Sequence, residues 1–183
     1  MKSVAVYCGH QFGSDAKFEQ DARRLGQLLA VNKIRLVFGG GNVGLMGAVA
    51  NGALEFGGEV IGISTQQIMD LQEPMHEHIK NEVTSGISAR RERMYELADG
   101  FVILPGGMGT LDELTDIMVK QQIKETHKPL FFLNSRRYWD MFGKLFAHMH
   151  MAGFLPNPKA YHMHIFETPE DVIKHIIKNE SQI

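Results

Sequence analysis

Short apolar runs alternate with longer stretches of helical periodicity along this sequence. The apolar runs predict strands at Val4 to Tyr7, Ile34 to Phe38, Glu59 to Ile63, Asn81 to Thr84, Phe101 to Leu104, Leu130 to Leu133 and, at an edge, Met163 to Phe166. Helices are predicted over Asp15 to Asn32, from the end of the first glycine-rich turn to about Phe56, and over Ser88 to Ala98, Thr110 to about Glu125, Tyr138 to His150 and Pro169 to Lys178. Residues 65 to 80 are predicted to be loop with a helical turn.

The central strands are continuously apolar, which indicates a sheet that is covered on both faces. Because strands and helices alternate, we expect an α/β fold with a doubly wound, mostly parallel, Rossmann-like sheet. Ligands of such sheets bind beyond the carboxyl ends of the strands, near the point where the strand order reverses. The chain has 183 residues, the length of one domain, so residues 1–183 are expected to form a single domain.

Composition and charge narrow the classes of function. The hydrophobic content of 44% is typical of a soluble globular protein, and a net charge of −2 argues against a broad nucleic-acid surface. Cys8 is the single cysteine, so no intramolecular disulfide can form, which fits a reducing, cytoplasmic setting. No apolar segment approaches the roughly 18 residues that cross a membrane, and the first residues lack the apolar length of a signal peptide. We therefore expect a cytoplasmic protein without membrane or nucleic-acid partners.

Glycine is over-represented, at 19 residues where an average chain of this length carries about 13. Eight of the 19 stand in two strand-to-helix turns: Gly39, Gly40, Gly41, Gly44, Gly47, Gly106, Gly107 and Gly109. Glycine lets the backbone approach a ligand closely, and a helix N-terminus offers free N–H groups to an anion. Two such turns at one edge predict a ligand that carries a phosphate. The alternative is that these glycines only allow tight turns and close helix–sheet packing.

The first glycine turn matches the G-x-G-x-x-G pattern at Gly39, Gly41 and Gly44, with Glu59 about 20 residues further on. This match to a dinucleotide fingerprint is weak, because the turn follows the second predicted strand and Glu59 starts a strand instead of ending one. The turn is not a Walker loop either, since Leu45-Met46 stands where Lys-Ser/Thr is required.

The second glycine turn continues into a longer motif, Pro105-Gly106-Gly107-Met108-Gly109-Thr110-Leu111-Asp112-Glu113, and an arginine-bearing helix, Ser88 to Met94, precedes it. Together with the first turn, these motifs resemble those of the Lonely Guy family, whose older label is "possible lysine decarboxylase". The resemblance runs from Val4 to about Pro156. It implies hydrolysis of the N-glycosidic bond of a purine nucleoside 5′-monophosphate, such as AMP, to free base and ribose 5-phosphate. It also implies a homodimer, and no cofactor or metal ion is expected.

By this resemblance the catalytic residues are Arg90 and Glu113, and the substrate-binding residues are Arg91, Gln72 and the loop residues Gly107, Met108, Gly109 and Thr110. The glycine argument adds Gly39, Gly40, Gly41 and Gly44 as candidate ligand contacts. The chemistry is consistent with these roles. Glycosidic cleavage passes through an oxocarbenium-like cation that a carboxylate stabilises, and a guanidinium binds phosphate through two parallel hydrogen bonds.

Each catalytic candidate also has a structural interpretation. Thr110 and Glu113 have the spacing of a capping box, in which the glutamate bonds back to the start of its own helix. Arg90, Arg91 and Arg93 can form a solvated basic face, and positions 90 and 91 point about 100° apart on a helix. The sequence leaves these alternatives open.

Several positions depart from the family pattern: His10-Gln11 where serines are frequent, Gln72 at a glutamate position, Ile87-Ser88 for Met-His, and Val119-Lys120 for Thr-Trp. These departures predict an altered choice of ligand and argue against plant-type cytokinin substrates. The alternative function is a non-catalytic protein that binds or carries a nucleotide or a phosphorylated cofactor. Its fold would be related to that of molybdenum-cofactor carrier proteins.

Other chemistry-bearing residues receive structural interpretations. Of the pairs His76/His78, His148/His150 and His162/His164, only the last is spaced to chelate on a strand, and no third ligand is evident. Cys8 is expected to be a small buried hydrophobe. Lys128 lies in a short helix-to-strand connection, which argues against a pyridoxal-dependent decarboxylase. The helix from Tyr138 to His150, rich in Met, Phe and Trp, is either a dimer interface or part of the core.

Overall fold

The computed structural model describes residues 1–71 and 76–180. Its strands are β1 (Ser3–Tyr7), β2 (Arg35–Phe38), β3 (Val60–Thr65), β4 (Lys80–Thr84), β5 (Gly100–Ile103), β6 (Leu130–Leu133) and β7 (Met163–Phe166). Its helices are α1 (Ala16–Val31), α2 (Gly44–Glu55), α3 (Gln66–Leu71), α4 (Ile87–Leu97), α5 (Met108–Gln122), α6 (Asp140–Met151) and α7 (Pro169–Glu180), with short 3-10 turns η1 (Ser135–Arg137) and η2 (Pro158–Ala160). The elements follow the predicted ones closely, and α3 supplies the helical turn expected within residues 65–80.

The strands form one seven-stranded sheet in the order β4-β3-β2-β1-β5-β6-β7, and every neighbouring pair is parallel. The chain adds strands on one side of β1 and then crosses back to add β5, β6 and β7 on the other side. The strand order therefore reverses between β1 and β5, which pair through Tyr7 and Ile103 at their carboxyl ends. This arrangement confirms the predicted doubly wound, Rossmann-like fold, and it places β7 at an edge as expected.

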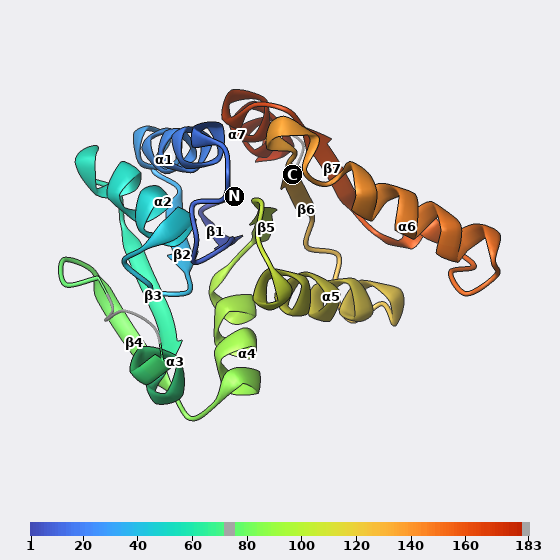
Figure 1. Cartoon of the computed structure of the whole chain (residues 1–183), viewed down its shortest axis with the longest axis horizontal. Helices are drawn as coiled ribbons and strands as arrows, with labels where there is room; N and C mark the ends of the chain where they lie inside the picture. The colour runs from blue at the N-terminus through green and yellow to red at the C-terminus, as the bar shows by residue number, and fades with distance from the viewer. Residues whose placement is uncertain (72–75, 181–183) are drawn as a thin grey trace.

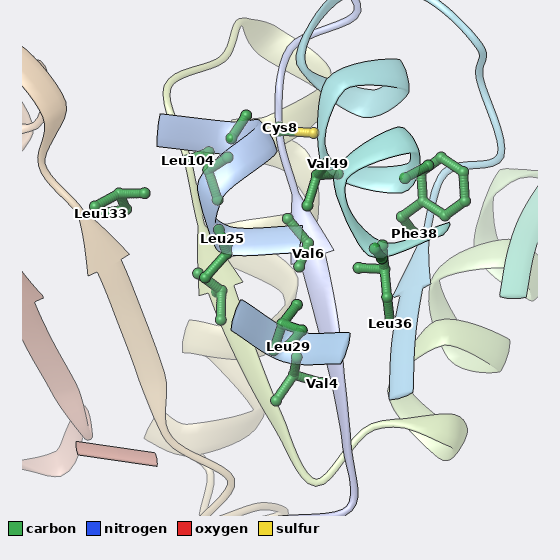
Figure 2. Packing of buried hydrophobic residues seen from close by; sticks show 14 of the residues in the cluster. Val4, Val6, Cys8, Leu25, Leu29, Leu36, Phe38, Val49, Leu104 and Leu133 are labelled. Carbon is green, nitrogen blue, oxygen red and sulfur yellow. The ribbon is translucent and has the colours of Figure 1, made fainter. Parts of the chain in front are cut away.

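Alternate residues of each central strand feed two separate cores. Val4 and Val6 of β1 point into a core shared with α1, α2 and α7, whereas Ala5 and Tyr7 point into a second core with α4 and α5. Figure 1 shows these helices on the two faces of the sheet, and Figure 2 shows the packing of the first core around β1. Because both faces are covered, the strands need no polar alternation, which explains their continuous apolar sequence.

The start of α5 differs from the sequence expectation. The helix begins at Met108 with Gly107 as its N-cap, so Thr110 stands at the third helical position and Glu113 lies beyond the first turn. The predicted capping box is therefore wrong. Thr110 is instead buried with its hydroxyl close to Gly106, because the loop before α5 folds tightly against the end of β1.

The helix expected over Tyr138 to His150 begins at Asp140, and none of its residues is buried. Phe142 and Phe146 pack against the second core from one side, while Met141, Leu145 and Met149 are exposed at a spacing of four residues. Trp139, just before the helix, is itself buried in that core, so the segment contributes to the core on one side and leaves an exposed apolar stripe on the other. No helix in the described part of the chain is long and apolar enough to cross a membrane.

Candidate active site

A cavity of about 520 Å³ opens where the strand order reverses, at the carboxyl ends of β1 and β5. This is the position at which doubly wound sheets bind ligands, and the volume is that of a small-molecule site. Its lining includes the loop after β1 (residues 8–13), the segment from Pro105 to Thr110 with Asp112 and Glu113, the aromatic residues Phe18 and Tyr138, and Gly39, Met46, Ile68, Ile87 and Arg90. The predicted location of the site is thus matched by the geometry.

Arg90 is held at the floor of this cavity with its guanidinium buried. Its Nε donates to the carbonyl of Ile63 at 2.8 Å, and its Nη1 donates to Oε1 of Glu113 at 2.7 Å. Gly39 makes room for the guanidinium, because a Cβ built on that glycine would lie 2.4 Å from Nη2. The interpretation of Arg90 as part of a solvated basic face is therefore wrong. Gly39 of the first glycine turn and Arg90 of α4 instead fit against each other.

Glu113 reaches the same floor from α5 and is also buried, at 7% exposure. Burial raises the pKa of this carboxyl above its ordinary value, and Arg90 offsets part of that rise through its charge and its hydrogen bond. A carboxyl with a raised pKa that lies in a cleft beside a charge partner is a candidate for proton transfer. The structure therefore brings the two predicted catalytic residues into direct contact.

The first turn of α5 forms one wall of the cavity. Gly107, Met108, Gly109 and Thr110 occupy the N-cap to third positions, whose four amides have no partner within a helix, and no side chain caps them. A Cβ built on Gly107 or on Gly109 would meet nothing within 4 Å. These four predicted substrate-binding residues therefore present free N–H groups and open space, the arrangement that binds an anion at a helix N-terminus.

The first glycine turn has a different role. Among Gly39, Gly40, Gly41 and Gly44, only Gly39 lines the cavity. Gly44 adopts a φ of +60° and lies so close to the backbone of His10 that a Cβ would be 2.2 Å from its carbonyl oxygen. Close packing, and not ligand contact, therefore accounts for Gly44. This glycine allows the loop after β2 to pack against the loop after β1 at His10.

Two further predicted contacts are Arg91 and Gln72. Arg91 lies outside the lining and pairs with Asp112, and its Nε is 3.7 Å from Asp116. Gln72 lies outside the described residues. Its role and that of Arg91 remain predictions from the family resemblance.

Sequence reasoning missed the aromatic wall of the cavity, which consists of Phe12, Phe18 and Tyr138. The rings of Phe18 and Tyr138 meet edge to face with centroids 6.0 Å apart. Tyr138 follows β6 and Phe12 follows β1, so both stand past the carboxyl end of a strand. Aromatic residues just past strand ends are the available signal in the sequence, but helical periodicity from Tyr138 predicts a helix there, whereas α6 begins at Asp140.

The family departures divide into two groups. His10, Gln11 and Ile87 line the cavity and can alter what it accepts. Lys120, by contrast, pairs with Glu92 and Glu125 on the far surface of α4 and α5, and neither it nor Val119 lines the cavity.

The remaining candidates take structural positions. His162 lies beside His127, whereas His164 packs against His175, so this pair does not converge. Within the described residues no group of three or more His, Cys, Asp or Glu side chains could hold a metal ion.

Cys8 is buried, and burial raises the pKa of its thiol well above the ordinary value, as expected of a hydrophobe. Lys128 donates to the Tyr95 carbonyl at 2.7 Å and does not line the cavity.

Comparisons with known proteins identify the family to which the chain is similar. A family described as "Possible lysine decarboxylase" matches residues 46–176. A cytokinin riboside 5′-monophosphate phosphoribohydrolase from Rhodococcoides fascians is 36% identical over 155 residues, which are 84% of this chain and 78% of the relative. A rice enzyme of the same name (Oryza sativa subsp. japonica) is also 36% identical, over 144 residues, which are 77% of this chain and 58% of the relative.

Solved structures show the same fold with lower identity. A molybdenum cofactor binding protein from Rippkaea orientalis superposes with a TM-score of 0.70 at 23% identity, covering 96% of this chain and 95% of that one. The molybdenum cofactor carrier protein of Chlamydomonas reinhardtii gives a TM-score of 0.72 at 19% identity, covering 96% of both chains. Because the family match spans Arg90, the second glycine turn and Glu113, and because relatives above 30% identity cover most of the chain, this protein belongs to the Lonely Guy family, which carries the older description "possible lysine decarboxylase".

Proposed function

We propose that this protein hydrolyses the N-glycosidic bond of an AMP-like purine nucleoside 5′-monophosphate, releasing the free base and ribose 5-phosphate. The observation that carries the proposal is the buried ion pair of Arg90 and Glu113, which lies at the floor of the cavity beside the open first turn of α5. Free amides suit the phosphate, and a buried carboxylate suits the cation that develops on the ribose. The names of the similar phosphoribohydrolases support the same reaction type.

The proposed step needs only water and the side chains of the cavity. The oxygen of water forms a bond to C1′ as the C1′–N bond breaks, and the electron pair leaves with the base. Glu113 stabilises the oxocarbenium-like charge and accepts the proton of the attacking water, since a raised pKa makes its carboxylate a stronger base. Arg90 holds the carboxylate in place. The departing base takes up a proton, and Asp112, which lines the cavity, is a candidate donor.

A direct test is to incubate the protein with AMP, GMP, CMP, UMP and a cytokinin riboside 5′-monophosphate and to separate the products by chromatography. Release of adenine with ribose 5-phosphate is the expected result. Because His10, Gln11 and Ile87 change the lining, we expect AMP to be a better substrate than the cytokinin nucleotide. Binding of monophosphates without release of any base would contradict the proposal.

The second candidate is a carrier that binds a nucleotide or a phosphorylated cofactor without cleaving it. It is favoured by the superposition with molybdenum cofactor binding and carrier proteins. A carrier has no need of a buried carboxyl with a raised pKa at its binding surface, whereas a hydrolase does. The presence of Glu113 in the cavity therefore favours the enzyme.

We further propose that the chain, as a single domain, assembles into a homodimer through the exposed stripe of Met141, Leu145 and Met149 on α6. These side chains are 68%, 49% and 39% exposed, and Met151 and Phe154 extend the apolar surface at the end of the helix. An apolar surface of this kind, on a helix that projects from the sheet (Figure 1), is typical of an interface. Light scattering at working concentration is the test, and a monomer would contradict the proposal.

A further inference from the structure

A tyrosine from the β6–α6 connection reaches across to the glycine turn that precedes α5. The hydroxyl of Tyr138 donates a hydrogen bond to the carbonyl oxygen of Gly106 at 2.6 Å. Tyr138 also lines the cavity, and 43% of its surface is exposed. The Tyr138 side chain thus contacts the Gly106–Gly107 turn, which leads directly into the first amides of α5.

The segment before Tyr138 is built to hold it in this place. Ser135 donates to Oδ2 of Asp21 at 2.6 Å in a buried contact, and Nε of Arg136 lies 2.7 Å from Oδ2 of Asp15. Asp15 is the N-cap of α1, and Asp21 lies in its second turn. Arg136 and Arg137 adopt left-handed backbone angles, with φ of 55° and 59°. Such angles are unfavourable for residues other than glycine and persist where surrounding contacts impose them, commonly at functional sites.

The hydrogen bond to Gly106 acts on the next amide through the geometry of the peptide. A trans peptide is planar, so its C=O and N–H point in opposite directions. Fixing the carbonyl of Gly106 therefore fixes the direction of the Gly107 N–H, the first of the four free amides of α5. Hydrogen bonds in a chain also polarise one another, so a carbonyl that accepts from Tyr138 makes that N–H a stronger donor.

We propose that Tyr138 is a positioning residue of the anion site: it orients and polarises the Gly106–Gly107 peptide, so that the Gly107 N–H binds the phosphate of the ligand. This inference deepens the proposed function, on which it rests for the phosphate-bearing nature of the ligand. It does not require that the ligand be cleaved. Tyr138 itself acts through the peptide and not on the reacting atoms.

The test is the affinity for ribose 5-phosphate, measured by calorimetry with the full chain. Tyr138→Phe keeps the ring against Phe18 and removes the hydroxyl. The expected result is an affinity about three- to tenfold weaker, the effect of one modest hydrogen bond. Tyr161→Phe is the matched control, because that hydroxyl donates to Gln122 at 3.2 Å at the other end of α5. It should leave the affinity unchanged.

A spectroscopic readout separates positioning from a general loss of structure. In the wild type, ribose 5-phosphate should move the amide proton resonance of Gly107 downfield, and in Tyr138→Phe this shift should be smaller while resonances of the β strands stay in place. With AMP, the variant should raise KM more than it lowers kcat.

Three results would overturn the inference: equal affinities of wild type and Tyr138→Phe, an equal loss in Tyr161→Phe, or no binding of ribose 5-phosphate by the wild type. If the wild type binds ribose 5-phosphate and Tyr138→Phe weakens that binding, but no base is released from any monophosphate, the proposed hydrolysis fails while the role of Tyr138 stands.

Discussion

Nη1 of Arg90 lies 2.7 Å from Oε1 of Glu113, and this contact joins α4 to α5 beneath the cavity. Both side chains are buried, at 10% and 9% exposure, so neither charge is solvated by bulk water. Ionised groups in such a place interact strongly with each other and with any charge that develops in the cavity. The pair is therefore both a structural link and the chemical centre of the site, and variants can separate these two roles.

Glu113→Gln tests the chemical role. Glutamine has the size of the protonated glutamate, but it leaves the buried guanidinium of Arg90 without its charge partner. The free energy of unfolding should therefore fall by about 3 kcal/mol, while the variant still folds. Turnover should fall by roughly 10²- to 10⁴-fold, the contribution of a general base. Urea unfolding and product chromatography measure the two effects.

Glu125→Gln provides the matched control, since Glu125 pairs with Lys120 on the surface, 2.9 Å away and outside the cavity. The free energy of unfolding should change by no more than about 0.5 kcal/mol. Turnover should stay that of the wild type. A Glu113→Gln enzyme with wild-type turnover would remove Glu113 from the mechanism.

Arg90→Met tests the electrostatic role through pH. Without Arg90, only the smaller effect of the Arg91 charge offsets the burial that raises the pKa of Glu113. A carboxyl whose folded pKa is raised contributes stability that is fully present below its unfolded pKa and is lost as pH rises through the folded pKa. The stability deficit of the variant should therefore grow from about pH 4.5 upward and reach roughly 3–5 kcal/mol near neutral pH.

The decisive measurement is the slope of the free energy of unfolding with pH, because the lost volume of the arginine adds a cost that is independent of pH. In the double variant Arg90→Met with Glu113→Gln, this slope should disappear. Parallel pH profiles for the wild type and Arg90→Met would show that Glu113 is not held by Arg90 in solution.

Gly109→Ala tests the open wall of the cavity. The added methyl group meets no protein atom within 4 Å, and alanine is the better helix former, so stability should be unchanged or higher by up to about 1 kcal/mol. The methyl group stands where the ligand approaches the first turn of α5, and turnover should fall by roughly a hundredfold. Thermal unfolding and steady-state kinetics measure these effects.

Gly143→Ala is the control for this variant, since Gly143 lies within α6 and a Cβ there also meets nothing within 4 Å. It should show the same gain in stability with unchanged turnover. Equal turnover in both variants would mean that no ligand occupies the space beside Gly109.

Leu145→Glu tests the proposed interface on α6. Leu145 is the middle residue of the exposed stripe, and a carboxylate there would lose its hydration in a dimer. The variant should run as a monomer in light scattering while its circular dichroism stays that of the wild type. Val31→Glu introduces the same charge at an exposed apolar position at the end of α1 and should leave the assembly unchanged. Dissociation by both variants would point to a general effect of charge.

The order of elements and the location of the site could be predicted because both depend on local patterns. Apolar runs such as Leu130–Leu133 are strands wherever both faces are covered, and strand-to-helix turns in a doubly wound sheet always lie at the ligand-binding edge. The start of α5 could not be predicted in the same way. Thr110 has the sequence signature of an N-cap, but its burial against Gly106 makes Gly107 the cap instead.

Periodicity predicted the α/β class and the sheet edge at which a ligand is expected, because it is a property of the chain alone, and the resemblance to the Lonely Guy family named Arg90 and Glu113 as candidates. The different roles of the glycines became visible only in the folded chain. Gly39 makes room for the guanidinium of Arg90, whereas Gly109 faces open space that a ligand can occupy. Only the tertiary structure brought Tyr138 to Gly106, 32 positions away, through a strained turn anchored on α1. Contacts between distant segments depend on how whole elements pack, and no local pattern in the sequence encodes them.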